Sequence, residues 1–232
     1  LRVVYAIVDG VNTQILYRDT EEEAFKPVIT TDFKDEITFT LFTFDNREVY
    51  ACTNINRERT AFVRMDPHTC NEQELIYEDP RYDVSSMVYS RLKKRLLYVY
   101  CSGHKDPVRH WLDQDERLFR EHLYAHFPGQ RVSIVDDDLQ EQRFLLRVGS
   151  DRTLGTYWLY DRPADTFLCI GEIAPWITPD DTVPMKAITY QTRDNLTIEA
   201  YLSMPRGAEG PVPMVIHPHG GPWSRDYWGC SP

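Results

Sequence analysis

The feature that most constrains the fold of this chain is a repeated strand–turn–strand pattern. Each copy reads as an apolar run, a polar turn and a second apolar run that closes on Asp, and the copies cover residues 3–19, 49–66, 97–113 and 144–161. The third copy is looser than the others. Successive copies start roughly 47 residues apart, close to the period of about 40 to 50 residues that is typical of four-stranded propeller blades. The sequence therefore predicts a mainly β fold with three to four blades of a β-propeller.

Such small sheets are apolar on both faces, so each must bury its faces against the next sheet. A closed propeller has up to about eight blades. We therefore expect these blades to form part of an N-terminal propeller, with further blades before Leu1.

One helix is expected among the strands. Asp113 and Glu116 have the spacing of a capping box, residues 115–127 carry a broad apolar face, and Pro128 with Gly129 ends it. His122 and His126 lie four positions apart on this helix. Because no Glu follows the first His and no third ligand is indicated, we expect no metal there.

Composition excludes several kinds of partner. The net charge is −10 and the pI about 5.2, which argues against a nucleic-acid partner and against an anionic membrane surface. No apolar run approaches the roughly eighteen residues that a membrane-spanning helix needs. The five cysteines are scattered, which favours free buried thiols over disulfides or a zinc site. No cofactor is expected.

The last fifty residues have a different organisation. A Pro- and Asp-containing connection at 174–184 separates them from the repeats, and we place the domain boundary near Asp181, giving domains 1–181 and 182–232. Strands are expected at 185–191 and 196–202 around a polar turn. The apolar run 213–216 is expected to be a short buried strand that leads to Gly220 and Gly221.

These residues resemble the opening of the catalytic domain of the prolyl oligopeptidase family of serine peptidases, particularly its acylaminoacyl-peptidase-like branch. The matching motifs are Ile188-Thr-Tyr190, Asp194-Asn-Leu196, Ala200-Tyr-Leu202 with Pro205, His219-Gly-Gly-Pro222 and Tyr227-Trp-Gly229. Asn195 stands where family members usually carry Gly, and Asn tolerates the same left-handed turn.

The resemblance implies a propeller followed by the first strands of an α/β-hydrolase domain. In that fold the nucleophile, the acid and the His all follow the oxyanion loop. No Gly-x-Ser-x-Gly occurs here, so we expect an internal segment of a longer enzyme, truncated before the nucleophile.

The resemblance also assigns roles to residues of the loop. The backbone N–H of Gly221 is the first choice for an oxyanion-hole donor, and that of Gly220 the second. Trp223, Tyr227 and Trp228 either line a substrate pocket or pack the loop. His219 precedes any nucleophile, so we expect it to hold the loop through a hydrogen bond rather than to act as the base.

Three functions remain open at this point. The preferred one is a serine peptidase that cleaves oligopeptides, with the propeller gating access of the peptide substrate. An esterase of the same fold and a non-catalytic propeller scaffold are the alternatives. The sequence leaves open the cleavage-site preference, the compartment and whether subunits form a homo-oligomer.

Overall fold

The computed structural model describes residues 1–221 and 224–230. The chain divides into two compact units. The first unit is Leu1–Gly103 with Pro107–Gln114, and the second is His104–Asp106 with Asp115–Pro232. Each unit has its own apolar core.

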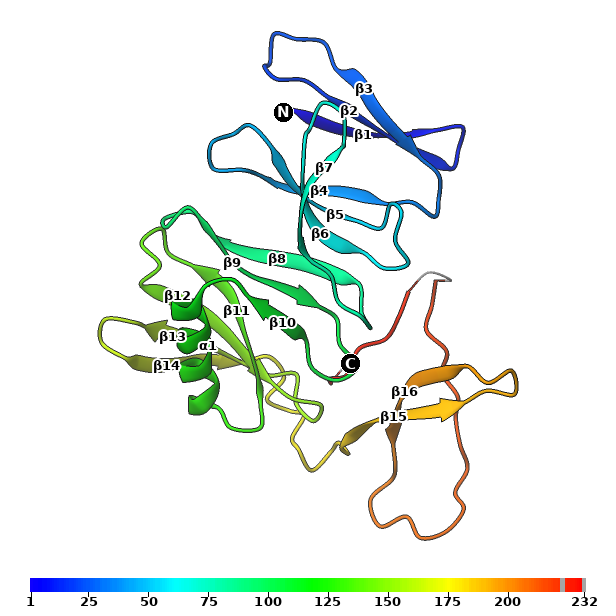
Figure 1. The fold of residues 1–232 in the computed structure, drawn as a ribbon. Coiled ribbons are helices and arrows are strands. Elements are labelled where there is room, and N and C mark those ends of the chain that lie inside the picture. Colours follow the sequence, from blue (N-terminus) through cyan, green and yellow to red (C-terminus); the bar gives the residue numbers. More distant parts are fainter. Residues whose placement is uncertain (222–223, 231–232) are drawn as a thin grey trace. The chain divides into compact units, whose positions relative to one another are not determined.

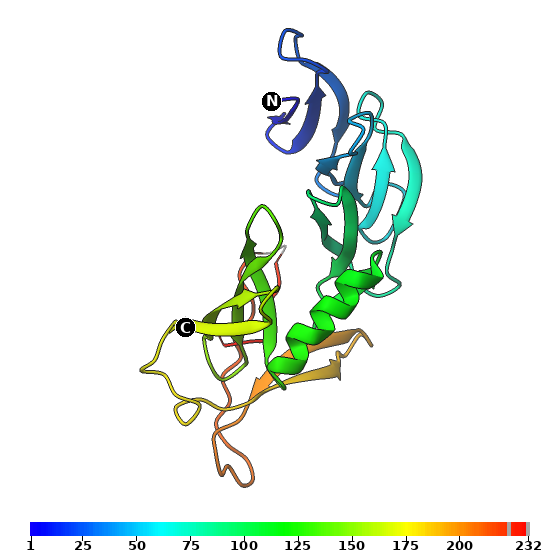
Figure 2. The ribbon, with the colours of Figure 1, turned by 90° about the vertical axis from the view of Figure 1, so that its left-hand side faces the viewer.

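The first unit consists of three antiparallel sheets whose strands follow one another in chain order (Figures 1 and 2). Their orders are β1-β2-β3, β4-β5-β6-β7 and β8-β9-β10. The strands are β1 (Val3–Val8), β2 (Asn12–Tyr17), β3 (Lys26–Thr31), β4 (Ile37–Phe42), β5 (Val49–Thr53), β6 (Ala61–Met65), β7 (Glu72–Tyr77), β8 (Val84–Ser90), β9 (Arg95–Cys101) and β10 (Val108–Trp111).

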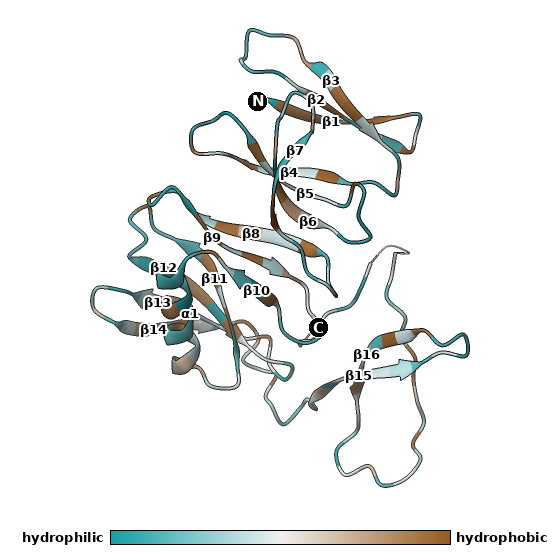
Figure 3. Ribbon diagram, viewed as in Figure 1, coloured by the Kyte–Doolittle hydropathy of each residue, from teal (hydrophilic) through white to brown (hydrophobic). Residues whose placement is uncertain are grey.

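The middle sheet of this unit, β4–β7, buries apolar side chains on both faces. On one face Val49 and Val63 share a cluster with Ile15 of β2. On the other, Phe62 shares a cluster with Val99 of β9. Alternate residues of one strand therefore serve two neighbouring sheets, as the period of two along a strand requires. The prediction that each sheet buries its faces against the next is confirmed here, and apolar residues concentrate in the strands (Figure 3).

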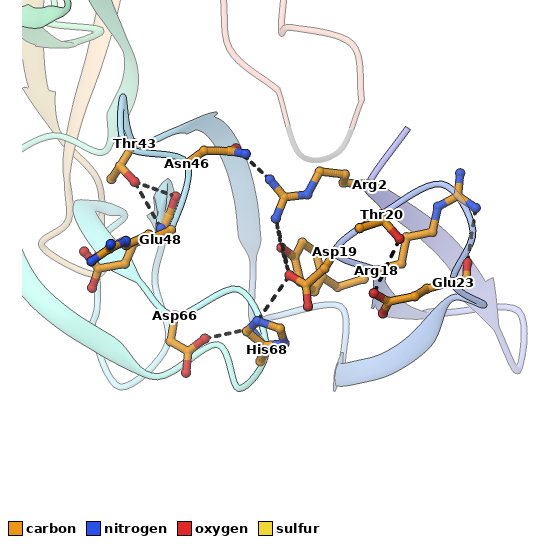
Figure 4. Close-up of polar contacts among 12 residues, drawn as sticks. Arg2, Arg18, Asp19, Thr20, Glu23, Thr43, Asn46, Glu48, Asp66 and His68 are labelled. Carbon is orange, nitrogen blue, oxygen red and sulfur yellow. Dashed lines mark hydrogen bonds and ion pairs between the residues drawn. The ribbon is translucent and has the colours of Figure 1, made fainter.

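Polar side chains also join the first sheet to the second (Figure 4). Arg2 donates to Oδ1 of Asn46 at 2.6 Å, and its guanidinium lies 4.2 Å from the ring centroid of Phe42. Nε2 of His68 lies 3.4 Å from Oδ1 of Asp19, which also accepts from the Tyr17 hydroxyl at 2.9 Å. These side chains lie between the sheets β1–β3 and β4–β7 and connect them.

The second unit contains the helix, a four-stranded antiparallel sheet β11-β12-β13-β14 and a hairpin β15-β16. Its elements are α1 (Gln114–His126), β11 (Arg131–Asp137), β12 (Arg143–Gly149), β13 (Thr156–Asp161), β14 (Thr166–Glu172), β15 (Met185–Gln191) and β16 (Thr197–Ser203). The buried Phe119, Leu123 and Phe127 of α1 pack on Phe144 and Leu146 of β12. The predicted helix is confirmed, one residue earlier than expected.

All four predicted repeats form antiparallel hairpins. They are β1–β2, β5–β6, β9–β10 and β12–β13. In the two four-stranded sheets the repeat supplies the two central strands. The mainly β fold and its blade-like sheets are therefore as predicted, with two sheets of three strands and two of four.

The hairpin β15–β16 also agrees with the sequence, and Asn195 has the expected left-handed backbone (φ 65°). The expectation of a buried strand at 213–216 is wrong. These residues form no strand, and Met214, Val215 and Ile216 are exposed. A strand needs a partner for its backbone groups, and no strand among the described residues pairs with this one.

The domain boundary near Asp181 stays a prediction, because β11–β14 and β15–β16 fall within one compact unit. Among the described residues, no helix combines the length and apolar character needed to cross a bilayer.

Candidate functional site

The candidate site is the segment that carries Gly220 and Gly221. Both glycines are exposed, and Gly221 has φ 134°, a conformation that other residues rarely adopt. A Cβ placed on Gly220 would meet no heavy atom within 4 Å, so the space beside it is open. Open backbone at a Gly-Gly turn allows a ligand atom to come close to a main-chain N–H. Trp223, a predicted substrate-binding residue, lies outside the described residues.

His219 forms the hydrogen bond that the sequence predicted for it. Its Nδ1 lies 2.8 Å from the carbonyl oxygen of Gly220. Because a carbonyl oxygen only accepts, Nδ1 carries the proton in this contact. In the part of the chain that the structure describes, no three His, Cys, Asp or Glu side chains form a group that could hold a metal ion.

The two described aromatic candidates have different surroundings. Tyr227 is 61% exposed, and the guanidinium of Arg225 lies 5.3 Å from its ring centroid. Trp228 is 8% exposed. Tyr227 therefore faces solvent, whereas Trp228 is packed against protein.

Trp228 contacts three separate parts of the second unit. Its indole N–H donates to the carbonyl oxygen of Met185 at 2.7 Å. Its own carbonyl oxygen accepts from Arg131 Nη1 at 3.0 Å, while Arg131 Nη2 donates to the carbonyl oxygen of Lys105 at 2.6 Å. The Lys105 ammonium and the Arg131 guanidinium lie over the indole, 4.7 and 5.1 Å from the ring centroid. A cation over an indole ring is attracted by its electron-rich face.

A second group of contacts joins residues 104–106 to β16. The Tyr201 hydroxyl donates to the carbonyl oxygen of His104, and His104 Nε2 lies 3.2 Å from the carbonyl oxygen of Ala200. One carboxylate oxygen of Glu199 lies 3.9 Å from His104 Nδ1, and the other lies 3.9 Å from Arg225 Nη2. Arg225 therefore ties the glycine segment to the hairpin as well.

The connection before β15 is fixed by two arginines. Arg206 donates to the carbonyl oxygens of Pro179 and Thr182, and Arg152 also donates to Pro179. The Met185 N–H donates to Asp151 Oδ2 at 2.7 Å. Sequence reasoning missed Arg131, Arg152 and Arg206, since nothing in their local pattern distinguishes them from surface arginines.

The chain is similar to two curated proteins, both named as dipeptidyl peptidases. The chain is 28% identical over 195 residues to dipeptidyl aminopeptidase BIII of Pseudoxanthomonas mexicana, covering 81% of this chain and 28% of that protein. It is 22% identical over 268 positions to dipeptidyl peptidase family member 6 of Caenorhabditis elegans, covering all of this chain and 36% of that protein. The chain thus spans about a third of the length of these curated relatives. No family model matches it.

The fold has solved counterparts. A prolyl endopeptidase structure superposes with a TM-score of 0.60 at 10% identity, covering 89% of this chain and 30% of that one. At that identity the superposition reports the fold alone, and it places the blade-like sheets among those of prolyl endopeptidases.

Proposed function

We propose that the protein is a serine-type peptidase of the prolyl oligopeptidase family that cleaves oligopeptides by acyl transfer. The observation that carries the proposal is the 28% identity to a dipeptidyl aminopeptidase across 81% of the chain. The acylaminoacyl-peptidase-like branch stays a prediction.

Acyl transfer builds negative charge on the former carbonyl oxygen, and a fixed N–H donor stabilises it. We assign that donor to Gly221, with Gly220 as the second choice. The open, positive-φ backbone of Gly221 supports this assignment. The other donor and the Ser, acid and His would come from residues after this chain, in the order that this fold uses.

Propeller gating is the second part of the proposal. Blades that bury both faces against their neighbours are rigid, as the two clusters on β4–β7 illustrate. A rigid array in front of a hydrolase would admit short peptides and exclude folded proteins. We expect degradation of oligopeptides and resistance of folded protein substrates.

The test uses the full-length protein and a fluorophosphonate, which labels an activated Ser. We expect labelling of one Ser and hydrolysis of peptide amides. Gly221→Ala keeps the N–H but strains the φ of 134°, so the donor should be displaced and kcat should fall about 100-fold. Gly171→Ala is the matched control, since a Cβ there meets no heavy atom within 4 Å.

Other outcomes point to the alternatives. Absence of labelling would contradict the proposal of a serine-type enzyme and would favour the non-catalytic propeller scaffold. Labelling with hydrolysis of matched esters but not amides would identify an esterase. Dipeptidyl amides compared with longer blocked peptides would show whether the substrate preference follows the names of the two relatives.

A further inference from the structure

Trp228 is the first buried side chain after the glycine pair among the residues that the structure describes. Every described side chain between Gly221 and Trp228 is exposed or half-buried, and Trp228 itself is 8% exposed. Before the glycines, residues 213–219 are exposed and form no strand or helix. The glycine segment is therefore held in this unit from its C-terminal side.

Three hydrogen bonds anchor Trp228 and the residues that follow it. The indole N–H is bonded to Met185 at the start of β15, and the backbone carbonyl is bonded to Arg131 at the start of β11. Two positions later the Cys230 N–H donates to the carbonyl oxygen of Ser150 at 3.1 Å. Residues 228–230 are thus joined to both the four-stranded sheet and the hairpin.

Arg131 connects this anchor to a third segment. Its two terminal nitrogens donate to the carbonyl oxygens of Trp228 and Lys105. A planar guanidinium fixes both acceptors in one geometry, which the single ammonium of a Lys cannot do. Lys105 in turn places its ammonium over the indole. The ring is enclosed by protein groups and is not available as a pocket wall.

We propose that Trp228 is a positioning residue for the glycine loop. This inference rests on the proposed function. Trp228 sets the direction of the Gly221 N–H and does not contact the substrate. Only seven positions separate the two residues, so the anchor limits the space that the glycines can occupy. An oxyanion donor acts only when it is aimed at the developing charge, and a displacement of about 1 Å can cost about 100-fold in rate.

The test is carried out in the full-length protein with Trp228→Phe, Trp228→Leu and Arg131→Lys. Phe keeps an aromatic face for the two cations but loses the N–H donor, and Leu loses both. Trp176→Phe is the control, because Trp176 belongs to the same unit and is 76% exposed. Titration of active sites with a fluorophosphonate counts the folded, competent enzyme, so kcat per titrated site is independent of losses in folding.

The expected result is a fall in kcat per site of about tenfold for Trp228→Phe and more for Trp228→Leu, as a donor displaced by less than 1 Å would give. KM should stay within about twofold, since the donor acts on the transition state rather than on bound substrate. Arg131→Lys should lower kcat in the same manner, and Trp176→Phe should leave it unchanged.

Unchanged kcat per site in all three variants, with normal labelling of the unsubstituted enzyme, would overturn the positioning role of Trp228. The proposed function would not be affected by that result. A parallel rise in KM at constant kcat would also overturn the positioning role, because it would make Trp228 a substrate-binding residue. Absence of labelling in the unsubstituted protein would instead overturn the proposed function and the inference with it.

Discussion

Gly155 packs directly against the backbone of Val148: a Cβ added to Gly155 would lie 2.5 Å from the Val148 carbonyl oxygen. Gly155 precedes β13 and has φ 105°, so a side chain is excluded both by space and by backbone conformation. The close approach closes the β12–β13 hairpin.

Gly155→Ala should therefore destabilise the protein by about 2 to 4 kcal/mol, from the combined cost of overpacking and of a left-handed Ala. Urea denaturation followed by far-UV circular dichroism measures it. Gly171→Ala is the control, because Gly171 has open space and lies in a strand, where Ala is favoured by about 0.5 kcal/mol or more. Equal midpoints for the two variants would contradict the prediction.

Substitution of Phe62 tests the packing between the sheets β4–β7 and β8–β10. It is fully buried in β6 and belongs to the cluster that includes Val99. Phe62→Ala should cost about 3 to 5 kcal/mol, the usual range for a large side chain lost from a core. Phe33→Ala, at a residue that is 67% exposed, should change the stability by less than about 0.5 kcal/mol. A small effect at Phe62 would show that the two sheets are not packed as described.

The parts of the fold that the sequence predicted are local. Alternation of apolar residues and a polar turn specify a hairpin such as β12–β13, because both strands and their turn lie within one short stretch. Asn195 is a similar case, since the left-handed turn depends on that residue's own short polar side chain. The period of the repeats then indicates how many sheets there are.

The contacts that fix the candidate site are not local. Arg131 and Trp228 are 97 residues apart, as are Tyr201 and His104. No periodicity or turn signal connects residues at that separation, so the sequence predicted an aromatic residue near the loop but not what holds it. The strand expected at 213–216 failed for a related reason: an apolar run specifies a strand only together with a partner strand.

The cysteines should differ in thiol reactivity according to how deeply they are buried. Burial raises the pKa of Cys52 and Cys70 to about 11 and that of Cys101 to about 12, so these thiols stay protonated at pH 8. Cys169 is exposed on β14. Iodoacetamide at pH 8 should modify Cys169 rapidly and leave the three buried thiols intact, as measured by mass mapping of peptides. Cys169→Ser is the control that should remove the fast reaction; rapid alkylation of Cys52 or Cys101 would contradict their burial.

The last prediction concerns pH and the contact between α1 and the β13–β14 turn. Oδ1 of Asp165 lies 2.8 Å from His122 Nε2 and accepts from the Tyr160 hydroxyl at 3.0 Å. These hydrogen bonds, that of His122 first, hold the pKa of Asp165 below its ordinary value of 3.8. A carboxylate with a lowered folded pKa stabilises the protein above about pH 4, and the contribution is lost as pH falls through the folded value.

Asp165→Asn should therefore lower the thermal midpoint at pH 7, and the difference from the unsubstituted protein should shrink to nothing between about pH 4 and pH 2. Asp9→Asn is the matched control, because Asp9 is an exposed turn residue with nearly the same backbone conformation (φ 51° against 49°). Midpoints measured across the pH range for both pairs separate the lost carboxylate contact from a general effect of charge. A difference that stays constant down to pH 2 would show that the hydrogen bonds of Asp165 do not depend on its ionisation.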